Sequence, residues 1–169
     1  MTSDGFCQST GILLERGAQY RVEVSLPAGS ETWKDWNIPV TGPEGLALGS
    51  PNLTLTHRTI FALSFPFRRV WRPDWFVPVA RIGTRGADHY ALAAPATMFS
   101  ARKTGELFLF VNDAVIPVGV GPDGVSVGFD AYYRNNRGGQ AQITVRKLTE
   151  PGAPRAVCGP EVRCEDALM

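Results

Sequence analysis

Residues 106–113 read Glu-Leu-Phe-Leu-Phe-Val-Asn-Asp, and this stretch decides the fold class. The apolar run 107–111 places apolar side chains on both faces of an extended chain. A strand of this kind is covered on both sides, so we expect it at the centre of a sheet. The strand ends at Asn112 and Asp113, two residue types that leave strands readily and favour turns.

Other segments alternate apolar and polar residues with a period of two, which is typical of strands with one wet face. They are residues 20–24, 52–56 and 141–146, and residues 11–15 form a further short apolar run. The 18 glycines and 13 prolines are spread along the chain and leave little room for long helices. Many short strands without helices between them predict an all-β sandwich or barrel.

The chain length of 169 residues suits one domain. We predict a β-structured domain over residues 1–149 and a loop-like C-terminal tail over 150–169, with a second long loop at about 114–131. The first residues have no basic end and no apolar core, so they are not a signal peptide. No apolar run approaches the roughly 20 residues of a membrane span. We therefore expect a cytoplasmic protein or a domain excised from a longer one.

Charge and cysteine usage limit the classes of partner. Lys and Arg number 17 against 16 for Asp and Glu, a balance that argues against nucleic acid. The odd set of Cys7, Cys158 and Cys164 is not a dense disulfide framework. Two interpretations stay open: the thiols are free, or Cys158 and Cys164 form one disulfide. Zinc is not expected, because His57 and His89 are the only imidazoles available to complete a four-ligand site.

Motifs for catalysis are missing from the sequence. It has no G-x-S-x-G elbow, no H-E-x-x-H and no phosphate-binding glycine loop. His57 is placed at a wet strand end and His89 near a turn, and neither has a Ser or Cys nearby in a nucleophile setting. We therefore expect a binding domain rather than an enzyme.

Residues 65–76 alternate aromatic side chains with arginines. We predict a hairpin whose aromatic side chains enter the core while the arginines stay wet. Two alternatives stay open. The segment can contact a protein partner or a membrane surface, since aromatic and basic residues suit both, or it can form an aromatic platform for sugar rings.

Oxygen-rich side chains follow the central strand and precede the last one. Asn112 and Asp113 end the first, and residues 132–139, with Asn135 and Asn136, lead into the second. If the two strand ends are neighbours, Asp113, Asn135 and Asn136 converge at one edge of the domain. Calcium takes six to eight oxygen ligands of these types. The alternative is that these residues only form turns.

Five segments, spread over about residues 9–148, carry a family resemblance. They are STGILLERGAQYRVEV (9–24), WKDWNIPVTGPEG (33–45), VPVARIGTRG (77–86), GELFLFVND (105–113) and NNRGGQAQITV (135–145). In these segments and in their order, the chain resembles the LecA-type galactophilic lectins, which are small calcium-dependent bacterial proteins. The resemblance is closer still to their larger relatives that occur as appended domains. It implies a single two-sheet antiparallel β-sandwich of jelly-roll, galactose-binding-like type.

The resemblance implies a site in which calcium and galactose share one set of ligands. Asp113 corresponds to the acidic metal ligand, Asn135 and Asn136 to a pair of asparagines, and a backbone carbonyl near Asp35 or Trp36 to an early-loop ligand. The sugar's hydroxyls complete the metal's coordination in that family. The residues expected at the sugar are Asn112, Asp113, Asn135 and the aromatic side chains of Trp33, Trp36 or Tyr133.

The chain also departs from the family pattern. Between Asp113 and Asn135 lie 21 residues, including Asp123 and Asp130, where the lectins have a handful. The family's histidine and glutamine sugar contacts have no match. We predict a carbohydrate-binding module, with calcium as cofactor and a glycan or small sugar as partner, and with homo-oligomers adding avidity. The alternative is a non-catalytic interaction domain of a larger bacterial protein that has lost the lectin site and uses residues 65–76 to bind a protein or a membrane surface.

Overall fold

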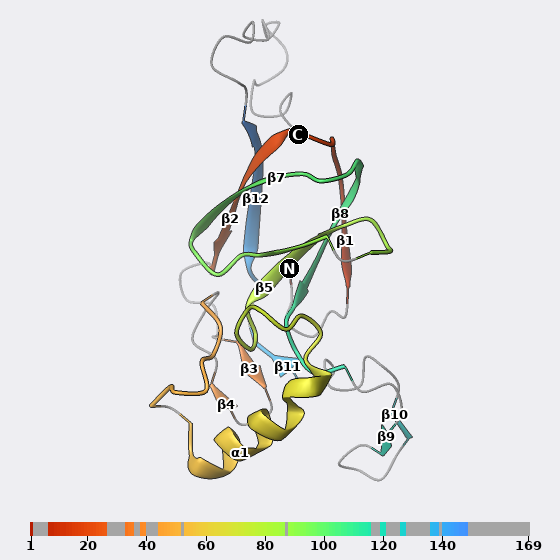
Figure 1. Ribbon diagram of the computed structural model, residues 1–169. Coiled ribbons are helices and arrows are strands. Elements are labelled where there is room, and N and C mark those ends of the chain that lie inside the picture. Colours follow the sequence, from red (N-terminus) through yellow and green to blue (C-terminus); the bar gives the residue numbers. More distant parts are fainter. Residues whose placement is uncertain are drawn as a thin grey trace, which may run out of the picture.

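The protein is a two-sheet antiparallel β-sandwich with one short α-helix at one end, which confirms the predicted fold class (Figure 1). The computed structural model describes residues 1, 7–26, 33–35, 38–39, 44–51, 53–86, 88–115, 119–120, 126–127, 136–138 and 140–148. Within these residues, no helix is long and apolar enough to cross a membrane. The predicted tail over 150–169 lies outside the described residues.

The two main sheets pack their apolar faces together. One has the strand order β1 (Gln8–Leu14), β8 (Gly105–Val111), β5 (Pro78–Ile82) and β6 (His89–Ala91). The other has the order β12 (Gln142–Leu148), β2 (Gln19–Ser25) and β7 (Ala96–Ser100). The alternation predicted over 20–24 is confirmed, because Tyr20, Val22 and Val24 of β2 are buried in the core between the sheets.

Strand β8 lies inside its sheet, between β1 and β5, as its sequence predicted. Leu107, Leu109 and Val111 enter the core between the sheets. On the opposite face Phe110 is also fully buried. The guanidinium of Arg69 covers that ring at 3.6 Å from its centroid. Both faces of β8 are therefore covered at residues 109–111, which explains why this part of the strand is apolar on both faces.

The strand predicted over 52–56 is wrong, because this segment begins the helix α1 (Leu55–Ser64). Thr54 is the N-cap, and its hydroxyl oxygen accepts a 3.2 Å hydrogen bond from the backbone N–H of His57. Leu53 and Leu55 would share one face of a strand, but here Leu53 is buried before the helix while Leu55 is exposed on it. His57 accordingly lies in the first turn of a helix and not at a strand end.

The hairpin predicted over 65–76 is also wrong. The segment forms a 3-10 helix, η1 (Phe65–Phe67), with Pro66 in its first turn, and then an irregular stretch. Its aromatic side chains divide into two groups. Trp75 and Phe76 are buried against Phe61 of α1, at ring-centroid distances of 5.1 and 5.9 Å, whereas Phe65, Phe67 and Trp71 are exposed.

Two smaller sheets complete the described structure. One has the order β11 (Asn136–Arg137), β3 (Lys34–Asp35) and β4 (Ile38–Pro39), and it lies near α1 at the same end of the domain (Figure 1). The other pairs β9 (Gly119–Val120) with β10 (Ser126–Val127). The region predicted as a long loop at 114–131 thus includes a short antiparallel ladder.

Candidate functional site

The predicted site residue Asn112 is fully buried where β8 ends. Its Oδ1 accepts a 2.9 Å hydrogen bond from the backbone N–H of Val70. Its Nδ2 donates to the carbonyls of Val70, Pro73 and Asp74 at 3.0, 3.1 and 3.0 Å. These bonds use both the acceptor and the two donor hydrogens of the amide. Asn112 therefore acts as a brace for the backbone of residues 70–74 rather than as a ligand group.

The next residue, Asp113, contacts Asn136, one of the two asparagines predicted to converge with it if two strand ends are neighbours. Nδ2 of Asn136 donates a 2.8 Å hydrogen bond to Oδ2 of Asp113, although the two residues are 23 positions apart. The other carboxylate oxygen accepts a 2.6 Å bond from the backbone N–H of Ala114. Both side chains are only 4% exposed. A carboxylate buried to this extent needs such partners, because loss of hydration is costly.

Asp35 is brought to the same place by strand pairing. In the antiparallel pair of β11 and β3, Asn136 lies directly opposite Asp35, and Arg137 opposite Lys34. The backbone of Asp35, which was predicted to offer a carbonyl ligand, therefore runs beside the residue that bonds Asp113. Three of the predicted positions thus lie together at one end of the sandwich.

The other predicted positions divide into two groups. Asn135, Tyr133 and Trp36 lie outside the described residues, and what was predicted of them stays a prediction. Trp33 is described and is buried in the core, so it cannot offer a face for sugar stacking. Cys7 is an exposed free thiol, while Cys158 and Cys164 lie outside the described residues.

The chemistry of this site fits calcium better than zinc. Asp113 offers carboxylate oxygens, Asn136 an amide oxygen and β3 backbone carbonyls, all of them oxygen ligands. Among the described residues, no three His, Cys, Asp or Glu side chains are grouped as a metal site, so a cation here would depend on amide, carbonyl and ligand oxygens as well. In this structure the amide nitrogen of Asn136 faces Asp113, and a cation between the two would require the amide oxygen in its place.

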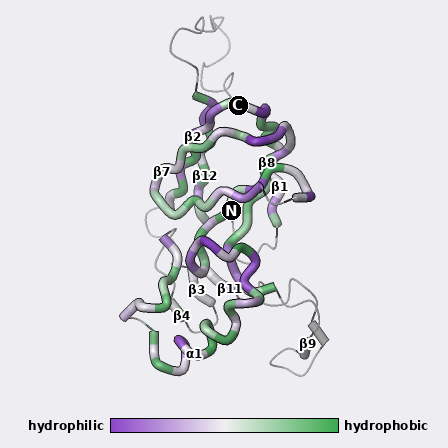
Figure 2. The backbone as a smooth tube through the Cα atoms, in the orientation of Figure 1, coloured by the Kyte–Doolittle hydropathy of each residue, from purple (hydrophilic) through white to green (hydrophobic). Residues whose placement is uncertain are grey.

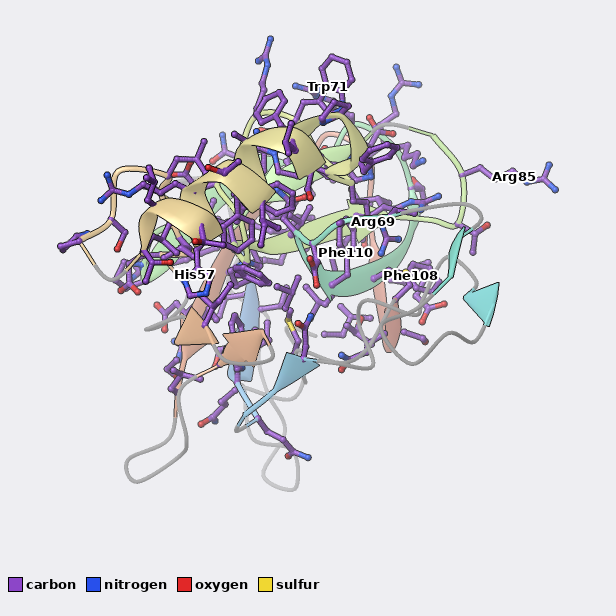
Figure 3. All side chains as sticks on the ribbon, turned by 90° about the horizontal axis from the view of Figure 1, so that it is seen from below. His57, Arg69, Trp71, Arg85, Phe108 and Phe110 are labelled. Carbon is purple, nitrogen blue, oxygen red and sulfur yellow. The ribbon has the colours of Figure 1, made fainter. Side chains whose placement is uncertain are left out.

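A basic surface on the outer face of the first sheet was not predicted. His89 of β6 makes an edge-to-face contact with Phe110, with ring centroids 5.8 Å apart. Burial, together with the charges of Arg81, Arg69 and Lys103, holds the pKa of His89 below its usual value, and Asp88 opposes that shift. Figure 3 shows Arg69 next to the Phe110 ring. The residues of this basic surface come from separate segments of the chain, so no local sequence motif predicted it.

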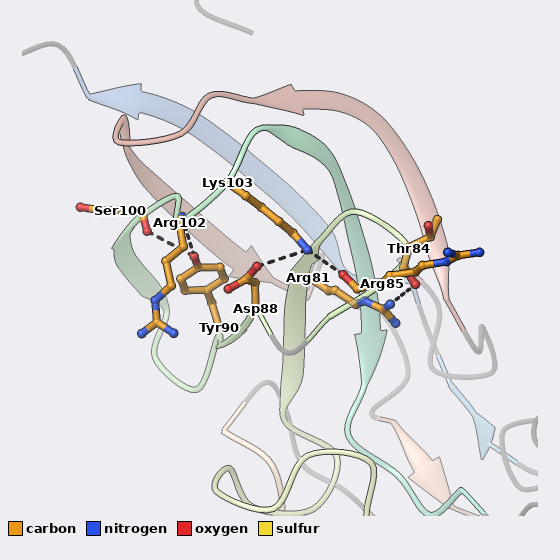
Figure 4. Close-up of polar contacts among 8 residues, drawn as sticks. All are labelled: Arg81, Thr84, Arg85, Asp88, Tyr90, Ser100, Arg102 and Lys103. Atoms are coloured by element: carbon orange, nitrogen blue, oxygen red, sulfur yellow. Dashed lines mark hydrogen bonds and ion pairs between the residues drawn. The ribbon is translucent and has the colours of Figure 1, made fainter.

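The cations of this surface are held by contacts within the chain (Figure 4). Lys103 pairs with Asp88 at 3.2 Å and donates to the carbonyl of Arg85 at 2.6 Å. Arg81 donates to the carbonyl of Thr84. These contacts fix the turn between β5 and β6, so the cluster serves the architecture and offers weaker support for a ligand site than Asp113 and Asn136 do.

Comparisons with known proteins give one similar structure. No protein-family model matches the chain, and no curated protein sequence matches it. The solved structure of the N-terminal domain of EclA, described as a PllA-like lectin, is similar to this chain, with a TM-score of 0.49. The two share 20% sequence identity, and the likeness covers 86% of this chain and 91% of that one.

Proposed function

We propose that this chain is a carbohydrate-binding domain whose ligand site lies where β8 ends beside β11 and β3. The observation that carries the proposal is the bond between Asn136 and Asp113, made opposite Asp35. Both side chains are buried, so the proposed sugar would meet this site through a bound cation, whose coordination the sugar's hydroxyl oxygens would complete. The order of the lectin-like segments in the sequence supports the same conclusion.

Calcium is the cation that we propose for this site. Asp113 would hold it through its carboxylate, with the amide oxygen of Asn136 and a backbone carbonyl of Asp35 as further ligands. The bound ion would supply a positive charge that sugar hydroxyl oxygens can coordinate. Galactose as the sugar rests on the sequence resemblance alone.

Thermal unfolding tests the metal. The midpoint of unfolding should be measured in calcium and in a chelator, for the wild type and for Asp113→Asn. Calcium at about 100 times its dissociation constant adds about 2.7 kcal/mol, which raises the midpoint by several degrees. Asp74→Asn is the matched control, because it makes the same change on an exposed residue. A midpoint that stays constant up to millimolar calcium would refute the metal.

A glycan array tests the sugar. A single neutral-sugar site is expected to bind with a free energy of about −4 to −8 kcal/mol, so the glycans should be displayed densely. Binding to galactosides should exceed binding to glucosides, and Asp113→Asn should abolish it while Asp74→Asn keeps it. Equal binding by the wild type and Asp113→Asn would show that the glycan lies elsewhere.

A further inference from the structure

Exposed apolar side chains gather at one end of the domain. Among the described residues, nine large hydrophobic side chains are exposed, and six of them fall between residues 55 and 71. We name these six the α1–Trp71 surface: Leu55, Ile60, Leu63, Phe65, Phe67 and Trp71. Leu55 is 81% exposed, Leu63 72% and Trp71 66%. Side chains this apolar and this exposed, grouped rather than scattered, mark a contact surface.

Helix geometry places the helical part of this surface on one side. Phe61 is the buried residue of α1, and it packs on Trp75. At about 100° per residue, Leu55, Ile60 and Leu63 project from the half of the helix turned away from Phe61. Figure 2 colours much of α1 as hydrophobic, although the helix lies at the outside of the domain.

The second part of the surface continues directly from the helix. The 3-10 helix η1 follows α1 without a break, and the ring of Phe65 lies 6.4 Å from that of Trp71. Figure 3 shows Trp71 projecting outward, on the side of α1 away from β3 and β11. Its backbone is fixed, because Asn112 bonds the carbonyls of Val70 and Pro73 on either side. The exposed indole is thus held outward by a braced segment.

Exposed arginines belong to the same segment. Residues 55–76 contain four arginines and one aspartate. Arg58 and Arg72 are exposed, as is Asp74, whereas Arg68 is buried and Arg69 covers the Phe110 ring. A partner for this surface should therefore be negatively charged and able to accept apolar side chains.

We propose that the α1–Trp71 surface binds the surface of membranes that contain anionic phospholipids. Leucine, phenylalanine and tryptophan side chains enter the boundary between headgroups and acyl chains, while arginines attract anionic headgroups. The side chains project from a short helix and from the turn after it, and among the described residues only Phe65 and Trp71 of this surface make a ring contact with each other. A soft headgroup layer can receive each of them, whereas a protein would need a groove of matching shape. The proposal does not depend on carbohydrate binding.

Sedimentation with lipid vesicles tests the proposal. The whole chain should sediment with vesicles of equal parts phosphatidylserine and phosphatidylcholine, and at least about tenfold more weakly with phosphatidylcholine alone. Added salt should weaken the binding, because it screens the attraction between arginines and headgroups. No sugar is present in these vesicles, and Asp113→Asn should still bind them, so this result is separate from the carbohydrate site.

Matched variants locate the contact. Trp71→Ser combined with Leu63→Ser should lower vesicle binding at least about tenfold. The control combines Leu13→Ser with Met98→Ser, which changes side chains of similar exposure, 65% and 70%, on β1 and β7. Arg58→Gln and Arg72→Gln should each lower binding about fivefold. All of these side chains are exposed, so the variants should fold, and circular dichroism checks this.

Three results would overturn the proposal. The first is a wild-type chain that does not bind anionic vesicles. The second is a loss of binding in the Leu13/Met98 control as large as in the Trp71/Leu63 variant. The third is a concentration-dependent dimer, seen by sedimentation equilibrium, that the Trp71/Leu63 changes disperse. That result would assign the surface to a second copy of the chain.

Discussion

Asn136 donates a 2.8 Å hydrogen bond to the carboxylate of Asp113, and this bond ties the short strand β11 to the end of β8. The amide N–H group points its partially positive hydrogen at a buried carboxylate, where a bound cation would also place positive charge. The stability of the domain should therefore depend on whether the Asn136 amide or the proposed calcium ion neutralises the Asp113 carboxylate, and measurements of stability can detect the ion.

Removal of the Asn136 amide tests this bond. Asn136→Ala should lower the free energy of unfolding by about 1–3 kcal/mol in a chelator, because the buried carboxylate of Asp113 loses this hydrogen bond. Urea unfolding measures the change. Asn136→Leu, which restores apolar volume but no donor, should be destabilised as well. If Asn136→Leu were as stable as the wild type, the lost hydrogen bond would not be the cause.

Asn136→Asp tests the cation directly. It places a second carboxylate beside Asp113, so the domain should be less stable in a chelator than the wild type because like charges repel. Calcium should then raise the unfolding midpoint more for this variant than for the wild type. Gln142→Glu, an amide-to-carboxylate change at an exposed position of β12, is the control. An equal calcium effect on all three proteins would contradict a cation at this pair.

Asn112 gives a prediction about the segment that carries Trp71. Asn112→Asp keeps an acceptor for the Val70 N–H but turns a carboxylate toward the carbonyls of Val70, Pro73 and Asp74. It should lower the free energy of unfolding by about 3 kcal/mol or more, because the buried charge keeps one donor, the Val70 N–H, and its other oxygen faces three carbonyls. Hydrogen exchange at the Val70 amide should stay slow in the wild type and quicken in Asn112→Ala. Unchanged exchange would contradict the brace.

The sequence predicted the parts of the fold that depend on local pattern. The doubly apolar run 107–111 placed β8 inside a sheet, and the alternation over 20–24 predicted β2, because burial acts directly on those patterns. Residues 52–56 show where pattern is insufficient. Leu53 and Leu55 have the spacing of one strand face, but Leu53 is buried before a helix and Leu55 is exposed on it, and Thr54 caps that helix.

The same distinction applies to the candidate site. The turn-forming residues after β8 were evident from sequence, and the convergence of Asp113 with Asn136 was predicted on the condition that two strand ends are neighbours. In the structure, Asn136 belongs to the short strand β11, which pairs with β3. The role of Asn112 was not predictable, since its four partner groups belong to residues 38 to 42 positions earlier. The division of the 65–76 aromatic side chains into buried and exposed groups likewise depends on Phe61 and Asn112, which lie outside that segment.

Gly45 should tolerate no side chain. It has a φ of +78°, and an added Cβ would lie 2.4 Å from Cγ2 of Val77 and 2.5 Å from the carbonyl oxygen of Trp75. Gly11 is a matched control with a φ of +71° and open space around it. Gly11→Ala should therefore lower the free energy of unfolding by about 1–3 kcal/mol through backbone strain alone. Gly45→Ala should lower it clearly more, because the backbone of residues 75–77, just before β5, must also move. Equal losses on urea unfolding would show that the close approach at Gly45 does not matter.

His89 should make the stability of the domain depend on pH. Burial and the charges of Arg81, Arg69 and Lys103 lower its pKa in the folded state. As the pH falls through the ordinary histidine pKa of about 6.5, the unfolded chain takes up a proton before the folded one does, so this contribution to stability is present above that pH and is lost below it.

His89→Gln should flatten the pH dependence of stability in that window. Nuclear magnetic resonance of the imidazole should show a folded-state pKa below the ordinary value, and Arg69→Gln should raise it. A folded-state pKa at or above the ordinary value would mean that the basic surface does not act on His89.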